Sequence, residues 1–368
     1  SPVAPFRILN IGNTKKVFMQ QYSVITENLN KSFDVDSVLK NLDLKIIKGE
    51  IMAIVGPSGC GKTTTLRLIA GFEQPDKGKI ILGDTIVADE KTFLPPEKRG
   101  VGMVFQDFAL FPHLTVAENI SFGIKSKDKE KIREEVDSLL ELVALNNLGD
   151  RFPHELSGGQ RQRVSLARAL APKPDLILMD EPFSNIDADT RLIIREEVRK
   201  ILKKLKTTAI FVTHDQEEAL FMGDRLAVMN EGELEQIGTP ENVFQQPKSR
   251  FVAEFMGNTD FIPGVISKKG IKTEIGELEQ RINLPIGTKI DIAVRFDDLK
   301  LKKSKKPNAI VLARHFKGSM NIYRLQLPSG NILHAYAKHT KTIELGKFVK
   351  VKLDPGHDLA CFIGEKAL

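Results

Sequence analysis

The pentapeptide Leu156-Ser157-Gly158-Gly159-Gln160 lies between two other patterned stretches of this sequence. Upstream, Gly56-Pro57-Ser58-Gly59-Cys60-Gly61-Lys62-Thr63 follows the short apolar run Ile51–Val55. Downstream, the apolar run Leu176–Met179 ends in Asp180-Glu181. The upstream stretch has the glycine spacing and the Lys-Thr ending of a phosphate-binding loop, and it follows a predicted strand, as such a loop requires.

The two flanking stretches together predict a site that binds and hydrolyses a nucleotide. Backbone N–H groups of a glycine-rich loop form a nest for phosphate oxygens. Lys62 would neutralise phosphate charge, and the Thr63 hydroxyl would ligate Mg²⁺. At the end of the downstream run, we expect Asp180 to hold Mg²⁺ through water and Glu181 to act as the general base on the attacking water.

Composition is typical of a globular protein, because 41% of the 368 residues are apolar and 28% are charged, and this length suffices for two domains. No apolar run approaches the ~18 residues that span a bilayer, and no export signal is evident. Residues 1–18 are interpreted as a leader or an extension before the natural start. The two cysteines, Cys60 and Cys361, do not suggest a disulfide framework, so a reducing cytoplasm is expected. The net charge of +6 is mild, and the dense run Lys300–Lys306 is interpreted as a solvated loop rather than a nucleic-acid surface.

The periodicity of apolar residues divides the chain into two predicted domains. Over 19–257, strands alternate with helices, which indicates an α/β domain with a mostly parallel sheet. Within it, the segment 108–150 has a helical character. Over 258–368, short alternating strands replace the helices, and the segments 286–292 and 345–351 resemble each other.

Taken together, the phosphate loop, the Leu-Ser-Gly-Gly-Gln signature and the acidic strand end resemble the ATP-binding-cassette (ABC) family. The resemblance covers nearly the whole chain. It implies a P-loop ABC ATPase of α/β class with a helical subdomain over 108–150. It further implies a small all-β, OB-like domain of TOBE type over 258–368. The cofactors implied are ATP and Mg²⁺.

The resemblance also assigns roles to single residues. Gln106 matches the Q-loop glutamine that reaches Mg²⁺ and the attacking water, and His214 matches the switch histidine that contacts the γ-phosphate. Asp187 matches the D-loop aspartate, although an isoleucine precedes it where leucine is more usual. Phe33 stands where the family stacks a tyrosine or tryptophan on adenine, and a core role is the alternative. The residues implied to bind ATP are Phe33, Gly56, Pro57, Ser58, Gly59, Cys60, Gly61, Lys62, Thr63, Thr64, Ser157, Gly158, Gly159, Gln160 and Asp187.

The signature allows two interpretations. Ser157 and Gln160 have the spacing of a capping box, which would serve only to open a helix. The two glycines between them, however, leave N–H donors at a helix N-terminus for an anion. In the family that anion is the γ-phosphate bound by a second copy. One phosphate loop and one signature per chain therefore imply a head-to-tail homodimer that encloses two ATP molecules.

Three classes of protein could contain these motifs: an importer ATPase, a soluble ABC ATPase of translation or DNA repair, and a nucleic-acid-binding module. Soluble ABC ATPases of translation or DNA repair usually have two cassettes or a long coiled-coil insertion, and the sequence has neither. A nucleic-acid module is not supported, because the C-terminal region lacks a clustered aromatic stacking platform. The sequence therefore predicts an importer ATPase on the cytoplasmic face of the inner membrane. Its expected partners are a second copy, permease subunits and, indirectly, a periplasmic or surface solute-binding protein.

The solute is predicted only by finer resemblance, because an ATPase subunit does not touch the cargo. Several stretches look more like ferric-iron importer ATPases than their relatives, and Fe³⁺ is the expected solute. Sulfate, polyamines and sugars are the alternatives. The stretches are 93–99, 169–174, 180–184, 251–257, 316–318 and 327–330.

The segment Phe108–Leu114 is apolar for a loop that follows Gln106. Exposed apolar patches of this kind usually mark a partner surface, so a groove for a permease helix is predicted here. The alternative is that Phe108, Leu110 and Phe111 fill the core of the helical subdomain.

Overall fold

The chain folds into two compact units, divided after Pro240. The computed structural model describes residues 21–368, so the predicted leader over 1–18 lies outside the described residues. The division by contacts falls before the predicted domain end at residue 257. As a result, α8 (Pro240–Gln245), apart from its first residue, and α9 (Arg250–Phe255) belong to the second unit. Over residues 21–368, no helix combines the length and the apolar character that crossing a bilayer would require.

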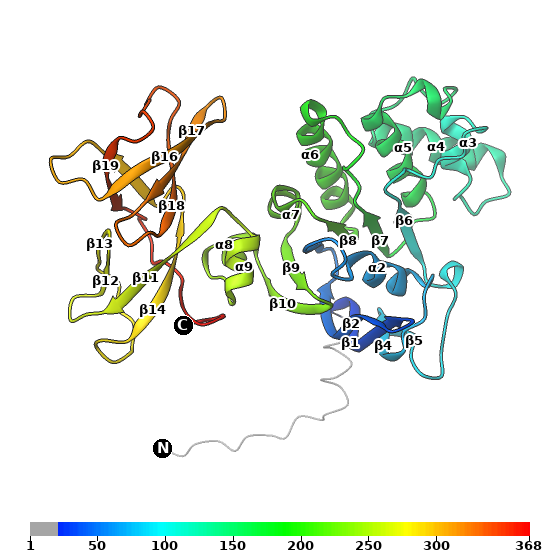
Figure 1. The fold of residues 1–368 in the computed structure, drawn as a ribbon. Helices are drawn as coiled ribbons and strands as arrows, with labels where there is room; N and C mark the ends of the chain where they lie inside the picture. Colours follow the sequence, from blue (N-terminus) through cyan, green and yellow to red (C-terminus); the bar gives the residue numbers. More distant parts are fainter. Residues whose placement is uncertain (1–20) are drawn as a thin grey trace, which may run out of the picture. The chain divides into compact units, whose positions relative to one another are not determined.

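The first unit contains two β-sheets with helices packed on them (Figure 1). The smaller sheet is antiparallel and has the order β2 (Asp36–Ile47), β1 (Tyr22–Phe33), β4 (Lys77–Leu82), β5 (Thr85–Ala88). The larger sheet has the order β10 (Glu233–Gly238), β9 (Arg225–Asn230), β3 (Ile51–Val55), β8 (Thr208–Thr213), β7 (Leu176–Asp180), β6 (Val101–Val104), and only its β10–β9 pair is antiparallel. The helices are α2 (Lys62–Ala70), α3 (Val116–Ser121), α4 (Lys129–Leu142), α5 (Gly158–Leu170), α6 (Ala188–Leu205) and α7 (Gln216–Met222), with 3-10 turns η1 (Pro96–Lys98) and η2 (Pro153–Glu155).

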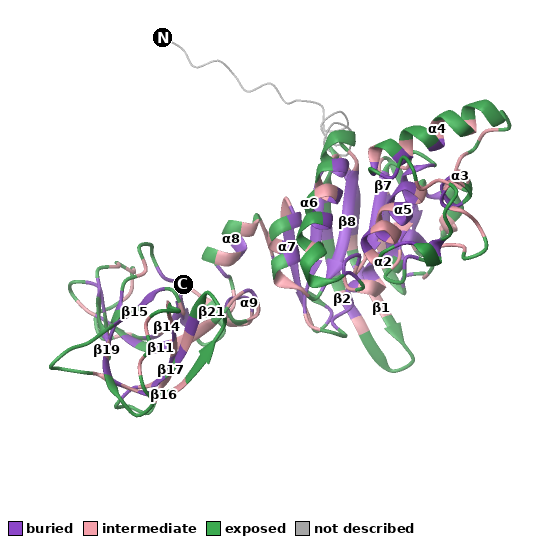
Figure 2. Ribbon diagram, turned by 90° about the horizontal axis from the view of Figure 1, so that it is seen from above, coloured by how far each residue is buried: buried purple, intermediate pink, exposed green. Residues whose placement is uncertain are grey.

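The parallel strands form where the sequence has continuous apolar runs, because both faces of each strand are covered. All residues of β3 and β8 are buried, and Figure 2 shows β7 and β8 in the buried colour between helices. Along β3, Met52 and Ile54 pack in one core with Leu66 and Ile69 of α2. The alternate residues of the strand face the other side, since side chains alternate along a strand. The predicted mostly parallel α/β fold is confirmed.

Within the segment over 108–150, the structure has two helices, α3 and α4, in agreement with its predicted helical character. A capping box at Thr115 begins α3. The Thr115 hydroxyl accepts from the Glu118 N–H, and the Glu118 carboxylate accepts from the Thr115 N–H. Asp128 caps α4 by accepting from two backbone N–H groups. On α4, Val136 and Leu140 are buried, so one face of this helix packs inward. The helices α3 and α4 contact each other, and each of them also contacts α5.

The second unit is built around two sheets after α8 and α9. The first has the order β13 (Gly276–Leu278), β12 (Ile271–Thr273), β11 (Thr259–Ile266), β14 (Lys289–Arg295), β20 (Cys361–Ile363), β21 (Lys366–Ala367). The second has the order β15 (Leu299–Lys302), β19 (Phe348–Leu353), β16 (Ala309–Phe316), β17 (Met320–Gln326), β18 (Ile332–Lys338). The strands of both sheets pair in antiparallel fashion, and inward side chains from both sheets share one apolar core. The two-sheet part of this unit, from β11 onward, agrees with the expected all-β, OB-like class.

Two details of the second unit bear on the sequence analysis. The resembling segments each place a left-handed glycine, Gly287 or Gly346, just before a strand, β14 or β19. The similarity therefore reflects the same turn-then-strand structure in two sheets. The interpretation of Lys300–Lys306 as a loop was wrong for its first part. Lys300 and Lys302 lie on β15, because Leu299 and Leu301 alternate with them and are buried in the core.

Arg99 anchors the end of the helix that follows the phosphate loop. Its guanidinium donates to the carbonyls of Leu68 and Ile69 in the last turn of α2, at 2.7 and 3.0 Å, and to Leu94 at 2.6 Å. A Cβ on Gly71, which ends α2 at φ +90°, would lie 2.5 Å from the Arg99 side chain. Burial lowers the pKa of Arg99 to about 10, so the group remains a cation at neutral pH. The negative end of the α2 dipole offsets that charge.

Replacing Arg99 by leucine should destabilise the first unit. The substitution leaves several buried carbonyls without donors, and we expect a loss of about 3 kcal/mol in the free energy of unfolding. Urea denaturation of the full chain measures this loss. Lys98→Leu, at an exposed neighbouring position, is the control and should change the midpoint little. An unchanged midpoint for Arg99→Leu would contradict the anchoring role.

Candidate active site

The phosphate loop joins β3 to α2 with two residues in the left-handed region, Gly59 at φ +83° and Gly61 at φ +99°. A side chain on Gly56 is also excluded, because its Cβ would lie 2.3 Å from the carbonyl oxygen of Met229. Nζ of Lys62 donates to the carbonyls of Gly56 and Pro57 at 2.8 Å. The Lys62 side chain therefore lies folded over the loop whose amides would bind phosphate. A phosphate bound there would compete with these two carbonyls for the N–H donors of Lys62.

Within this loop the side chains divide into two groups. Ser58 is exposed, and Thr63 and Thr64 are half-buried. The Cys60 thiol is only 3% exposed and belongs to the apolar core of the first unit. Burial raises the pKa of Cys60, against the opposing effect of Lys62. Cys60 can therefore meet a phosphate only through its backbone.

Two of the three predicted metal ligands, Thr63 and Asp180, lie side by side, and the third, Gln106, stays a prediction. The Thr63 hydroxyl donates to Oδ1 of Asp180 at 3.1 Å, joining the start of α2 to the end of β7. Burial raises the pKa of Asp180, and the Thr63 hydrogen bond opposes that rise. A hydroxyl and a carboxylate oxygen are hard ligands of the kind that Mg²⁺ prefers, usually together with phosphate oxygens and water. These residues fit the implied ion.

Glu181 has an unusual backbone conformation at the end of β7. Its φ is +42°, a region that residues other than glycine and asparagine seldom adopt. Its N–H donates to Val212 on β8 at 3.0 Å, and its carbonyl accepts from the Ser184 hydroxyl at 3.0 Å. The turn brings Oε1 of Glu181 to 3.1 Å from Nδ1 of His214. The structure thus pairs the predicted general base with the predicted switch histidine.

A largely buried network of hydrogen bonds holds the two neighbours of His214, and the sequence analysis did not predict it. Arg195 of α6 donates to Glu218 of α7 at 2.6 Å and to Asp215 at 3.0 Å. Glu218 also accepts from the Thr213 hydroxyl at 2.6 Å. Because Thr213 and Asp215 are the two neighbours of His214, this network fixes the backbone on both sides of the histidine. The only signal in the sequence was their adjacency to His214, since the charges on α6 and α7 look like surface residues.

Gln106 is joined to the turn after Glu181 through its backbone. Its carbonyl accepts from the side-chain amide of Asn185 at 2.9 Å. The Gln106 residue is exposed, and Asn185 was not predicted as a site residue. Phe33, at the end of β1, is 40% exposed with the Lys31 ammonium 5.0 Å from its ring centroid. That exposure leaves the ring available for stacking, although its role in binding adenine stays a prediction.

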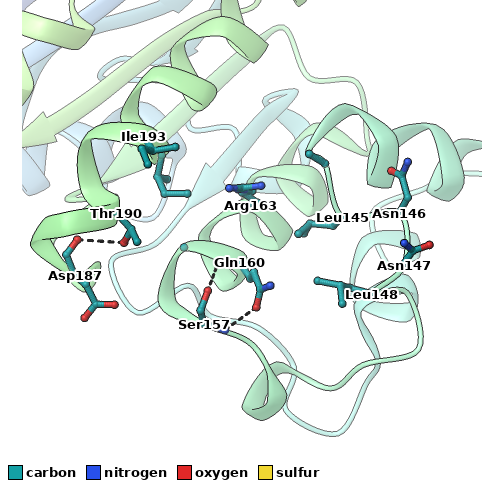
Figure 3. Close-up of a pocket in the computed structure, with 13 residues that line it drawn as sticks. Leu145, Asn146, Asn147, Leu148, Ser157, Gln160, Arg163, Asp187, Thr190 and Ile193 are labelled. Atoms are coloured by element: carbon teal, nitrogen blue, oxygen red, sulfur yellow. Dashed lines mark hydrogen bonds between the residues drawn. The ribbon is translucent and has the colours of Figure 1, made fainter.

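The signature forms the N-terminus of α5 and faces a groove (Figure 3). Ser157 accepts from the Gln160 N–H at 3.3 Å, and the Gln160 side chain accepts from the Ser157 N–H at 2.8 Å, so the capping box is present. The groove has a volume of about 650 Å³ and is also lined by Asp187 and by residues that follow α4. No residue of the phosphate loop lines it. Within one chain, the signature and Lys62 therefore belong to different surfaces.

Comparisons with known proteins agree with this geometry. The family profile described as ABC transporter matches residues 39–184, from the first part of β2 to the turn after Glu181. A spermidine/putrescine import ATP-binding protein from Acetivibrio thermocellus is 41% identical over 89% of this chain and 93% of its own length. This chain belongs to the family of ABC import ATP-binding proteins. Its ABC relatives include a sulfate/thiosulfate import protein from Agrobacterium fabrum, 47% identical over 74% of this chain and 80% of its own. An Fe(3+) ions import protein from Fusobacterium nucleatum is 44% identical over 70% of this chain and 68% of its own length.

Solved structures support the ABC fold of the first unit. A dimeric ATP-binding cassette in a post-hydrolysis state with ADP and Pi is 33% identical, with a TM-score of 0.52, over 59% of this chain and 98% of that chain. The second structure is the cbiO1 protein of Clostridium perfringens, part of an ABC transporter complex. It is 30% identical, with a TM-score of 0.57, over 61% of this chain and 92% of its own.

Glu181→Gln should retain ATP binding and lose turnover. The glutamine keeps the shape of the side chain but cannot accept a proton, and loss of a general base typically slows a reaction about 10²–10⁴-fold. Steady-state ATPase assays and nucleotide-binding titrations measure the two effects separately. Glu196→Gln, an exposed carboxylate on α6 paired with Lys200, is the matched control. Near-normal turnover by Glu181→Gln would remove Glu181 from the role.

Proposed function

We propose that this ABC import ATP-binding protein hydrolyses Mg-ATP at the edge formed by the ends of β3, β7 and β8. The Thr63–Asp180 contact beside the Glu181–His214 contact is the observation that supports this best. Lys62 and the loop amides would hold the β- and γ-phosphates, and Thr63 and Asp180 would hold Mg²⁺. The bound ion would neutralise phosphate charge. Glu181 would take the proton of the attacking water, and His214 would orient Glu181 and contact the γ-phosphate.

Two copies of the chain would complete each ATP site. The α5 N-terminus presents donors to an anion, yet its groove contains no phosphate-loop residue. A second chain in head-to-tail arrangement would supply the γ-phosphate to Ser157 and the two glycines. The dimeric state of the related cassette with ADP and Pi supports this arrangement. Asp187, which lines the same groove, would lie at the contact between the two copies.

The apolar segment after Gln106 is our proposed contact with a permease. Phe108 is 6% exposed and lies in the interior, so for this residue the core interpretation is the better one. Phe111 is half-buried, and its ring centroid lies 4.7 Å from that of Phe122, which is 69% exposed. The Phe111–Phe122 pair is the part that would receive a short cytoplasmic helix of the permease. The protein would then act peripherally, on the cytoplasmic face of the inner membrane, with a solute-binding protein as an indirect partner.

For the solute, we propose a polyamine in place of the ferric iron expected from the sequence. Spermidine/putrescine import proteins from several bacteria match 80–90% of this chain at 40–43% identity. Their matches extend beyond the residue-240 division, because they cover more of the chain than the first unit contains. The iron relative is the second candidate, since it is 44% identical over the shorter span that it matches.

Ser157→Arg should abolish hydrolysis while each chain still binds ATP through Lys62. Mixing it with Lys62→Ala should restore one composite site in each mixed dimer, up to about a quarter of wild-type turnover for random pairing of independent sites. ATPase assays of each variant alone and of the mixture measure this recovery. Full activity of Ser157→Arg by itself would contradict the two-chain site.

The solute is tested by reconstituting the chain with its permease in proteoliposomes and adding the binding protein loaded with one solute at a time. Spermidine or putrescine should stimulate ATP hydrolysis and enter the vesicles, and Glu181→Gln should block both. Stimulation by ferric iron alone would move the assignment to iron. Soluble ATPase activity without response to any of these solutes would reject the polyamine assignment and leave the ATPase assignment standing.

A further inference from the structure

The outer face of the β15–β19 pair carries like charges directly opposite one another. In the antiparallel register, Lys300 lies opposite Lys352, and Lys302 lies opposite Lys350. The residues between them point inward and are buried in the core of the unit, which fixes the lysines on the outer face: Leu299, Leu301, Val351 and Leu353.

This arrangement has a cost in the free energy of folding. Like charges at directly opposed positions of a sheet destabilise the pair. Over residues 21–368, no ion pair joins any of the four lysines to a carboxylate. An anion bound beside the strands would relieve the repulsion and would be held more tightly because of it.

A hollow at the edge of these strands provides a place for that anion. Its volume is about 600 Å³, and its lysines are Lys268, Lys269, Lys272 and Lys350. The first three come from the turn between β11 and β12 and from β12 itself, and Lys350 comes from β19. β13 contacts β19, which brings the two sheets together at this point (Figure 1). We call this the lysine hollow.

The acidic residues of the lysine hollow are already engaged. Glu277 accepts from the Ser267 hydroxyl at 2.7 Å. Glu274 accepts from the backbone N–H of Ser329 at 2.8 Å and from its hydroxyl. Four lysines against two glutamates leave an excess of two positive charges, and Lys302, opposite Lys350, adds a third nearby.

We infer that the lysine hollow binds a small, multiply charged oxoanion, such as a short chain of linked phosphates. Lysines from two strands and a turn line one hollow, which suits a compact ligand of several negative charges. A nucleic acid fits less well, because no aromatic side chain lines the hollow to stack on bases. This site lies in the second unit and is separate from the phosphate loop.

Isothermal titration with tripolyphosphate tests the inference. The phosphate loop would bind the same probe, so the full-length Lys62→Ala chain serves as the background. We expect saturable binding that weakens as salt is raised. Lys302→Glu and Lys350→Glu should each lower the affinity roughly tenfold or more, since each replaces a positive charge by a negative one. Lys317→Glu, at the turn after β16, makes the same charge change outside the hollow and should have little effect.

Stability separates loss of the site from loss of the fold. Without anion, Lys302→Glu should melt at the same temperature as the background or higher, because the introduced carboxylate would face Lys350 as an opposite charge. No binding of tripolyphosphate by the background chain would overturn the inference. So would equal weakening by Lys317→Glu, which would show only a general effect of net charge. Tighter binding of single-stranded RNA, unaffected by Lys350→Glu, would overturn it in favour of a nucleic-acid surface elsewhere.

Discussion

The register of the parallel strands β3, β8 and β7 is the constraint on which the active site depends. Val55 lies opposite Thr213, and Asp180 lies opposite Val212, so three chain segments leave the sheet at one edge. The phosphate loop, the acidic pair and His214 follow directly from those ends. Because side chains alternate along a strand, a slip of one residue would turn the acidic strand end to the opposite face. The buried apolar residues on both faces of these strands prevent that slip.

Two local features then orient the side chains at this edge of the sheet: the backbone turn at Glu181 and the Arg195–Glu218 pair. The left-handed turn at Glu181 directs its carboxylate toward β8 and His214 instead of along β7. Backbone strain of this kind persists where surrounding contacts hold it, and here the bonds to Val212 and Ser184 do so. The Arg195–Glu218 pair is buried, and such pairs add little net stability. We interpret it as holding the backbone around His214 in one conformation.

The sequence was sufficient for the fold class and for the residues at the strand ends, because apolar runs and the phosphate-loop spacing are local signals. It also predicted the helical region and the capping box at Ser157. It could not predict contacts between residues far apart in the chain. The contacts of Arg99 with the end of α2, of Asn185 with Gln106, and of Arg195 with Asp215 and Glu218 all depend on tertiary packing. Lys300 and Lys302 were misinterpreted because a run of charges hid the alternation with Leu299 and Leu301. The solute stays a proposal for another reason: relatives named for polyamine, sulfate and iron import are 40%, 47% and 44% identical to this chain, over matched spans of different length.

The orientation of Cys60 bears on how the site would respond to oxidants. Thiols react with peroxide as exposed thiolates, and both conditions are opposed here. The sulfur lies in the apolar interior, and burial raises the pKa of the thiol. A cysteine in a phosphate loop would otherwise couple ATP binding to the redox state of the cell. In this protein the Cys60 side chain belongs to the apolar core, so the loop contains a cysteine whose thiol is shielded from that chemistry.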